Sequence, residues 1–411
     1  MTLTRSDREQ MLKKISTAVA DKYYDPHFHG KDWKRTVATQ EQSIINADSD
    51  RAFESAVSEL LNELGSSGLG LLGPNTPITS RNSINASFRI VQTKTEGERW
   101  AFQDVLPGGV AEKAGIKPGD VLIAIAGKEI LPPEKPAFKM NRSTEITVSR
   151  VGQRRTANID LTTQKPKYSD NPYSEPRSVT DNLLDGSIGS IKVSLFPGMI
   201  GIDFANEVSA AFDAGLKRAE RLLIDLRGNP GGGIGGLRLM SYLTPDKRPI
   251  GFSLDRAMAE RGYSKERLPR LDHIPRSKLE IPLLALKFLG KKSVALQTEG
   301  LGDHQFHGRI AILANEHSTG AAEMLIQFAQ ENRLAVVVGT KTPGRLVSRS
   351  GTKLGKGYTL VVPVAAYTSW NGTQIEGRGI TPDVPIDWSY EASLEGRDPQ
   401  LERGLATLRS L

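Results

Sequence analysis

Apolar side chains recur every three or four positions through the first part of the chain, from Ser6 to Leu64. This period places them on one face of a helix. The expected buried faces carry Met11, Ile15, Ala18 and Val19 near the start, and Phe53, Val57, Leu60, Leu61 and Leu64 farther on. We therefore expect a segment of two or three helices, residues 1–64, without active-site chemistry.

The pattern then changes to short alternating strands, Phe88–Val91 and Trp100–Val105. Residues 107–122 follow, and their sequence predicts a short helix that ends at Gly115, a tight turn at Pro118 and Gly119, and a buried strand. This succession resembles the PDZ domain. The sequence therefore predicts a PDZ-like domain over residues 65–164.

PDZ domains bind an extended chain end by adding it as a strand to a sheet edge, and backbone amides take the terminal carboxylate. The stretch Gly68, Leu69, Gly70 and Leu71 is similar to the loop that holds this carboxylate. We expect it to be the peptide-binding segment of the module, with a plain turn as the alternative.

Strands and helices alternate after a linker at residues 163–177 that is rich in proline, lysine and serine. The expected strands are Ser187–Val193, Arg221–Leu226, Ile310–Leu313 and Leu334–Val338, and the expected helices are Phe204–Arg218, Gly236–Leu243 and Thr319–Asn332. Such alternation favours a largely parallel sheet covered by helices. Residues 165–411 are thus expected to form an α/β core, with residues 251–308 as a less regular insertion or lid.

The amino-acid composition excludes several classes of function. The 411 residues suggest two or three domains, and 38% hydrophobic with 25% charged residues is typical of soluble globular proteins. The net charge of +7 is spread along the chain without a basic stripe, so nucleic-acid binding is not expected. The absence of cysteine excludes disulfides and thiol nucleophiles.

No stretch of about 18 uninterrupted apolar residues predicts a membrane span. As written, the sequence fits a cytoplasmic protein, or a periplasmic or secreted one whose signal was removed. The histidine pairs His27 with His29 and His304 with His307 lack a third ligand at a usable spacing, so no metal site is expected.

A glycine-rich turn follows the apolar strand at 221–226, in the sequence LIDLRGNPGGG over residues 223–233. Glycines at such a turn let backbone N–H groups point into a cavity, where they can hold a developing oxyanion. Gly231 and Gly232 are the candidates. The same letters also satisfy a dinucleotide fingerprint, with Gly231, Gly233 and Gly236 followed by Asp255, and this is the rival interpretation.

Residues 315–345 begin NEHSTGAAE and end GTKTPGR, and residues 376–384 read EGRGITPDV. Together with the glycine-rich turn, these motifs resemble the C-terminal processing, or tail-specific, serine peptidases. The resemblance spans about Ile15 to Ile386. It implies an α/β core of the crotonase-like ββα type with a mostly parallel sheet, peptide or unfolded protein as substrate, and no cofactor, and it allows an oligomer.

The residues that the resemblance places at the catalytic positions depart from the family pattern. The serine nucleophile falls at Gly320 and the lysine base at Arg345, with an acidic or amide residue on the intervening helix at Glu331. Glycine has no attacking group, and a guanidinium does not release its proton to become a base.

Three readings of these departures remain open. In the first, Ser318 attacks and either Lys341 or His317 is the base. In the second, Gly320 marks a lost serine in a peptidase, with Lys341 as the base and Arg345 contacting the substrate. In the third, the chain is a non-catalytic protein that holds peptide ends in its cleft and PDZ module.

Overall fold

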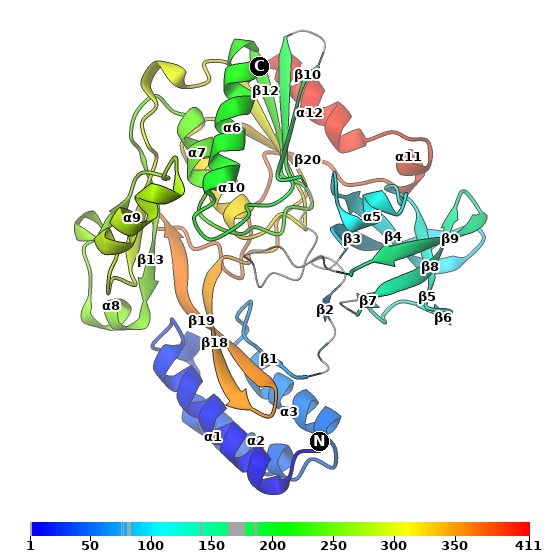
Figure 1. Cartoon of the computed structure of the whole chain (residues 1–411), viewed down its shortest axis with the longest axis vertical. Helices are drawn as coiled ribbons and strands as arrows, with labels where there is room; N and C mark the ends of the chain where they lie inside the picture. Colours follow the sequence, from blue (N-terminus) through cyan, green and yellow to red (C-terminus); the bar gives the residue numbers. More distant parts are fainter. Residues whose placement is uncertain are drawn as a thin grey trace.

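The computed structural model describes residues 2–74, 76, 78–79, 84–139, 142–162, 177–184 and 187–411. Three parts are distinct in Figure 1: helices α1–α3 lie at the bottom, a small β module lies at the right, and an α/β core occupies the rest. The linker predicted at 163–177 lies outside the described residues apart from its last residue.

The N-terminal segment forms helices α1 (Arg5–Lys22), α2 (Trp33–Ile45) and α3 (Asp50–Asn62). Thr4 caps α1 and Ser49 caps α3, as expected for hydroxyl side chains at N-caps. The predicted apolar faces are buried. They pack with Leu360 and Val362 in one hydrophobic cluster, which is separate from the larger cluster around the parallel sheet.

The β module is a sheet in the order β3-β4-β5-β8-β9, with β6 paired to β5. Its elements are β3 (Ala86–Thr93), β4 (Gly97–Val105), α5 (Val110–Lys113), β5 (Val121–Ile125), β6 (Lys128–Glu129), β8 (Ser143–Arg150) and β9 (Gln153–Asp160). The short helix and buried strand predicted from residues 107–122 are confirmed. Two further short strands, β2 (Ile78–Thr79) and β7 (Ala137–Phe138), pair beside it.

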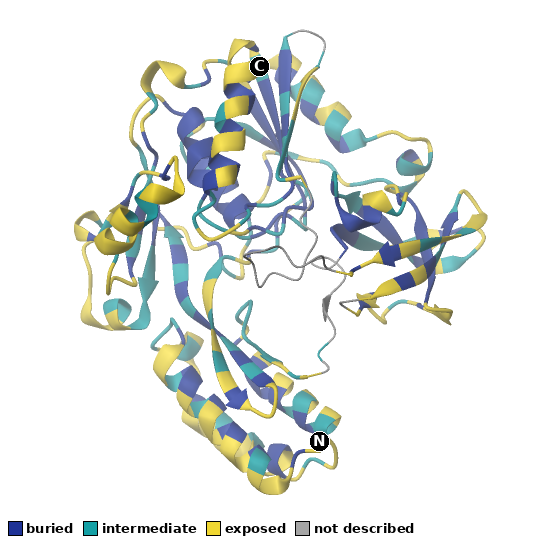
Figure 2. Cartoon of the chain, viewed as in Figure 1, coloured by how far each residue is buried: buried dark blue, intermediate teal, exposed yellow. Residues whose placement is uncertain are grey.

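One core sheet has the order β10-β11-β12-β16-β17-β20, and all its neighbours are parallel except β10 with β11. Its strands are β10 (Val179–Leu184), β11 (Ile188–Val193), β12 (Arg221–Asp225), β16 (Arg309–Ala314), β17 (Val336–Gly339) and β20 (Val384–Pro385). Helices α6 (Ile202–Ala214), α7 (Gly236–Tyr242) and α10 (Ala321–Glu331) cover one face, and α12 (Pro399–Ser410) covers the other. Figure 2 shows the strands and the inner helix faces buried.

A second core sheet has the order β1-β19-β13-β15-β14, with β18 paired to β19, and it is largely antiparallel. Its strands are β1 (Gly70–Leu72), β13 (Pro249–Asp255), β14 (Arg270–Leu271), β15 (Val294–Gln297), β18 (Val347–Gly355) and β19 (Tyr358–Ser369). The remaining helices are α8 (Arg256–Arg261), α9 (Ile281–Lys287), α11 (Tyr390–Leu394) and the 3-10 turns η1 (Phe28–Gly30), η2 (Leu216–Arg218), η3 (Lys265–Arg267), η4 (Lys278–Glu280) and η5 (Gly302–His304).

Two expectations about the core need adjustment. A mostly parallel arrangement holds for one of its two large sheets only, because β18 and β19 form a long hairpin and β13 runs antiparallel to β19. Residues 251–308 are also not a mere lid, since they supply three strands of the second sheet. The crotonase-like assignment stays a prediction. Among the described residues, no helix is long and apolar enough to cross a membrane.

Candidate active site

Three neighbouring parallel strands, β12, β16 and β17, end at the same edge of the sheet. The glycine-rich turn follows β12, the turn that leads into α10 follows β16, and the loop at 340–346 follows β17. Because carboxyl ends of parallel strands meet at one edge, these three segments lie together, where sites form in α/β sheets. This placement explains how motifs more than 100 residues apart form one pocket.

Hydrogen bonds join the first two segments directly. Thr319 N–H donates to the Asn229 carbonyl at 2.9 Å, and Gly228 N–H donates to Asn315 Oδ1 at 3.0 Å. Asn229 is fully buried, and its amide donates to the Val193 carbonyl at 2.8 Å. The glycine-rich turn and the start of α10 are therefore held in register by bonds that involve no catalytic side chain.

Gly320 has the backbone conformation of a strained strand-to-helix turn, with φ 63° and ψ −123°. Serine nucleophiles on such turns occupy similarly sparse regions. A Cβ placed on Gly320 would lie 3.3 Å from Gly231 Cα and 3.9 Å from the Arg345 carbonyl oxygen. A small side chain at this position would therefore require a slight shift of Gly231, and the chain supplies none.

Gly231 and Gly232 differ in what their N–H groups do. The Gly231 N–H donates to Asn229 Oδ1 at 2.7 Å, so it is already occupied. The N–H groups of Gly232 and Ala321 have no hydrogen-bond partner among the described residues, and both residues line the pocket. The pair of unoccupied donors is therefore Gly232 with Ala321, which corrects the expected pair of Gly231 with Gly232.

The loop after β17 is tied to α10 by Glu323, which is fully buried. Its carboxylate accepts from Gly320 N–H (3.0 Å), Thr342 Oγ1 (2.7 Å), Gly344 N–H (2.6 Å) and Arg345 N–H (2.8 Å). Burial raises the pKa of Glu323, and these hydrogen bonds offset the effect only in part. Arg345 is thereby fixed beside Gly320 at the pocket. From the sequence alone, Glu323 is expected to anchor the turn and to lie too far from Ser318 for a capping box; in the structure it is the third residue of α10 and its carboxylate accepts from the Gly320 N–H.

Lys341 and Glu331 lie elsewhere. Lys341 is exposed and does not line the pocket. Glu331 accepts hydrogen bonds from Gln327 and Ser369 at the far end of α10, roughly 16 Å from Gly320 along the helix axis. The structure therefore brings Gly320 and Arg345 together, but it does not bring Lys341 or Glu331 to them.

Ser318 is fully buried, and its hydroxyl is committed to the backbone. Its Oγ donates to the Leu226 carbonyl at 2.8 Å and accepts from Asn315 N–H at 2.9 Å. A nucleophile must reach a substrate carbonyl, so this geometry argues against the reading in which Ser318 attacks. The neighbouring His317 turns toward the β module, where its Nε2 lies 3.2 Å from Gln103 Oε1.

The expectation that Gly68–Leu71 forms a PDZ carboxylate loop is wrong. Gly70 and Leu71 belong to β1, which pairs with β19 in the second core sheet, and Leu69 packs against the N-terminal helices. Gly68 and Ser67 instead line the pocket at position 320. Glu376 holds this segment, since its carboxylate accepts from Ser67 N–H at 2.7 Å and from Leu346 N–H at 2.9 Å.

The complete pocket has a volume of about 430 Å³. Its lining consists of Ser67, Gly68, Pro230, Gly232, Thr319, Gly320, Ala321, Arg345, Leu346, Val347 and Arg349. The contributions of Ser67, Gly68 and Arg349 could not be expected from local motifs, because they depend on the pairing of β1 and β18 with β19.

The β module contacts the same site. Asp104, at the end of β4, accepts two hydrogen bonds of 3.0 Å from the Asn315 amide, and Arg89 on β3 pairs with Glu316 and Asp387. Asn315 therefore connects the module to both turns at the pocket.

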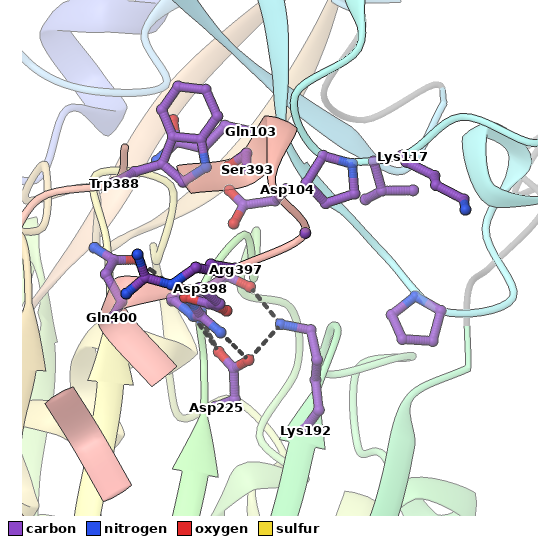
Figure 3. Close-up of a pocket in the computed structure, with 15 residues that line it drawn as sticks. Gln103, Asp104, Lys117, Lys192, Asp225, Trp388, Ser393, Arg397, Asp398 and Gln400 are labelled. Atoms are coloured by element: carbon purple, nitrogen blue, oxygen red, sulfur yellow. Dashed lines mark hydrogen bonds and ion pairs between the residues drawn. The ribbon is translucent and has the colours of Figure 1, made fainter. Parts of the chain in front are cut away.

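A second cavity of about 370 Å³ lies between the β module, the ends of β11 and β12, and the C-terminal segment (Figure 3). Asp225 at its floor pairs with Arg227 at 2.9 Å and with Lys192 at 3.1 Å. Burial works to raise the pKa of Asp225, but these two cations outweigh it and lower the pKa well below the usual range. Asp398 also pairs with Arg227, at 2.8 Å. This cluster anchors the start of the glycine-rich turn.

The dinucleotide interpretation does not fit this arrangement. Asp255 ends β13 in the second core sheet, whereas the fingerprint requires its acidic residue on the next strand of the same parallel sheet. A Cβ on Gly233 would lie 1.9 Å from the Gly198 carbonyl oxygen, which explains this glycine by close packing of two backbone segments.

Comparison with known proteins agrees with the motifs. Residues 187–386 match the model of peptidase family S41, and residues 102–150 match the PDZ domain model. The carboxy-terminal processing protease CtpA of Bacillus subtilis (strain 168) is 25% identical over 84% of this chain and 66% of its own length. A probable CtpA-like serine protease of Staphylococcus aureus (strain N315) is 23% identical over 84% of this chain and 62% of its own.

Solved structures show the same fold. The photosystem II D1 C-terminal processing protease aligns with a TM-score of 0.56 at 18% identity, covering 92% of this chain and 93% of that one. A putative S41 protease from Bacteroides fragilis NCTC 9343 aligns with a TM-score of 0.58 at 14% identity, covering 97% of each chain. The chain thus carries a segment, residues 187–386, that matches peptidase family S41 and a PDZ match at residues 102–150, and it is similar to the C-terminal processing serine peptidases.

Proposed function

We propose that this chain holds unstructured peptides or protein tails in the pocket at position 320 and that, as written, it is weakly active or inactive as a peptidase. The observation that carries the proposal is the pocket itself: strand ends, strained turn and unoccupied amides are in place, while Gly320 occupies the nucleophile position. Relatives described as C-terminal processing proteases support this class of substrate.

The unoccupied N–H groups of Gly232 and Ala321 are proposed as the oxyanion donors. Two amides that point into a pocket beside the nucleophile position can stabilise the oxyanion of a tetrahedral intermediate. Donors alone do not form a covalent adduct, and a guanidinium group such as that of Arg345 is not a general base that could activate an attacking group.

Mass spectrometry of an unstructured protein incubated with the purified chain tests the proposal. We expect binding with very few new chain ends, and the same result for Ser318→Ala. Rapid cleavage that disappears in Ser318→Ala would overturn the inactive interpretation and restore Ser318 as the nucleophile. Absence of any binding to unstructured chains would contradict the assignment of substrate class.

A further inference from the structure

Two guanidinium groups of the pocket at position 320 have no counter-ion. Arg345 and Arg349 both line it, and neither side chain makes an ion pair or hydrogen bond with another described residue. Arg349 crosses close to Gly68, where a Cβ would lie 2.4 Å from its Cδ. Planar guanidinium groups of this kind recognise carboxylates through paired hydrogen bonds.

Two carboxylates that bond to the backbone around this pocket are committed to other donors. Glu323 accepts four hydrogen bonds, from three backbone N–H groups and the Thr342 hydroxyl. Glu376 accepts from the N–H groups of Ser67 and Leu346 and from the Ser67 hydroxyl. Both acids therefore hold the walls together and leave the guanidinium groups without a partner.

Neutral donors add to these charges. The N–H groups of Gly232 and Ala321 line the same pocket without partners among the described residues. Gly320 adds no side chain to fill the volume of about 430 Å³. Two guanidinium groups and two amides around one open space provide the donors that a terminal carboxylate requires.

We propose that this pocket binds the free C-terminal carboxylate of a peptide, with Arg345 and Arg349 as its cationic ligands. In this arrangement the residue at the family's base position is a carboxylate ligand, and the chain end occupies the place where a scissile bond lies in an active peptidase. The inference rests on the proposed function, because it names which part of a tail the pocket holds.

Fluorescence anisotropy with one short unstructured peptide, prepared with a free C-terminal carboxylate and as the C-terminal amide, tests this. We expect the carboxylate form to bind the full chain about tenfold more tightly or better, since hydrogen bonds between charged groups are lost in the amide. In Arg345→Gln/Arg349→Gln this preference should disappear. Lys353→Gln, which removes an exposed charge from the same strand as Arg349, should keep it.

Equal binding of the two peptides would overturn the carboxylate site and leave the proposed function standing. Loss of binding of both peptides to the unaltered chain would contradict both. A preference that persists in Arg345→Gln/Arg349→Gln would place the carboxylate elsewhere, such as in the PDZ module, and would also overturn the inference. A photo-crosslinker next to the peptide's last residue should label segments 67–68, 230–232, 319–321 or 345–349, and exclusive labelling of residues 86–160 would contradict it.

Discussion

On one side of the pocket, the turn after β12 contains Gly232, whose N–H has no hydrogen-bond partner among the described residues, and Asn229, whose side chain holds the turn in place. On the other side, the turn after β16 and the loop after β17 hold Gly320 and Arg345 at the pocket, and neither of these two residues carries a hydroxyl or a side chain that acts as a general base. From this difference we expect buried hydrogen bonds to maintain the shape of the site whatever side chains stand at positions 320 and 345.

The largest effect on stability is expected under the glycine-rich turn. Asp225→Asn removes the carboxylate that faces Arg227 and Lys192 and leaves buried positive charge with less compensation. Breaking such a pair costs about 3–5 kcal/mol of unfolding free energy, and the remaining partner Asp398 favours the lower end. Urea unfolding measures this loss. The exposed Asp213→Asn serves as the control and should change stability little; equal losses in both variants would show that the cluster does not anchor the turn.

On the opposite side, Glu323→Gln should cost about 2–3 kcal/mol, because an amide cannot accept all four hydrogen bonds that the carboxylate receives. The loop at 342–345 should loosen with it, and hydrogen exchange at Gly344 and Arg345 N–H should accelerate. Glu98→Gln, on an exposed strand position, is the matched variant. Unchanged exchange in Glu323→Gln would mean that the loop is held by other contacts.

A smaller loss of stability is expected from a substitution at position 320. Gly320→Ala places a Cβ at φ 63° and 3.3 Å from Gly231 Cα, which should cost about 1–2 kcal/mol. Thermal unfolding can compare it with Gly70→Ala, where a Cβ meets no atom within 4 Å. If the two variants unfold alike, the strain at position 320 is absent in solution.

The two sides should also respond oppositely to pH. The pKa of Asp225 is lowered from 3.8, because its two cations outweigh burial, so its stabilising contribution is present above pH 3.8 and lost as the pH falls through the folded value. Burial raises the pKa of Glu323 above 4.5, so the folded chain binds the extra proton and stability declines as the pH rises from 4.5.

Urea titrations over a series of pH values can separate these contributions. Asp225→Asn should flatten the acid limb, and Glu323→Gln should flatten the decline above pH 4.5. If both variants flatten the same part of the pH–stability curve, the opposite pKa shifts assigned to Asp225 and Glu323 are contradicted.

The sequence predicted those parts of the site that depend on local motifs. The glycine-rich turn, the start of α10 and the positions of Gly320 and Arg345 could all be expected, since each follows a strand of one parallel sheet. Whether Lys341 lines the pocket was less predictable from the sequence. A shift of a few residues along the loop decides whether a side chain enters the pocket.

The sequence did not predict which distant strands pair with one another. Gly68 and Arg349 meet at the pocket only because β1 and β18 flank β19, and the apparent PDZ loop at 68–71 carries no local signal of this pairing. The burial of Ser318 likewise depends on the Leu226 carbonyl, which lies 92 positions earlier.

The most direct test of the central claim is cleavage of an unstructured protein by Gly320→Ser/Arg345→Lys, followed by mass spectrometry of the products. If the pocket retains its peptidase geometry, the double variant should produce new chain ends well above the unaltered chain, and Gly320→Ala/Arg345→Lys should produce none above it. A folded double variant that binds the protein but remains as inactive as its alanine counterpart would contradict the account. So would an unaltered chain that already cleaves at the same rate.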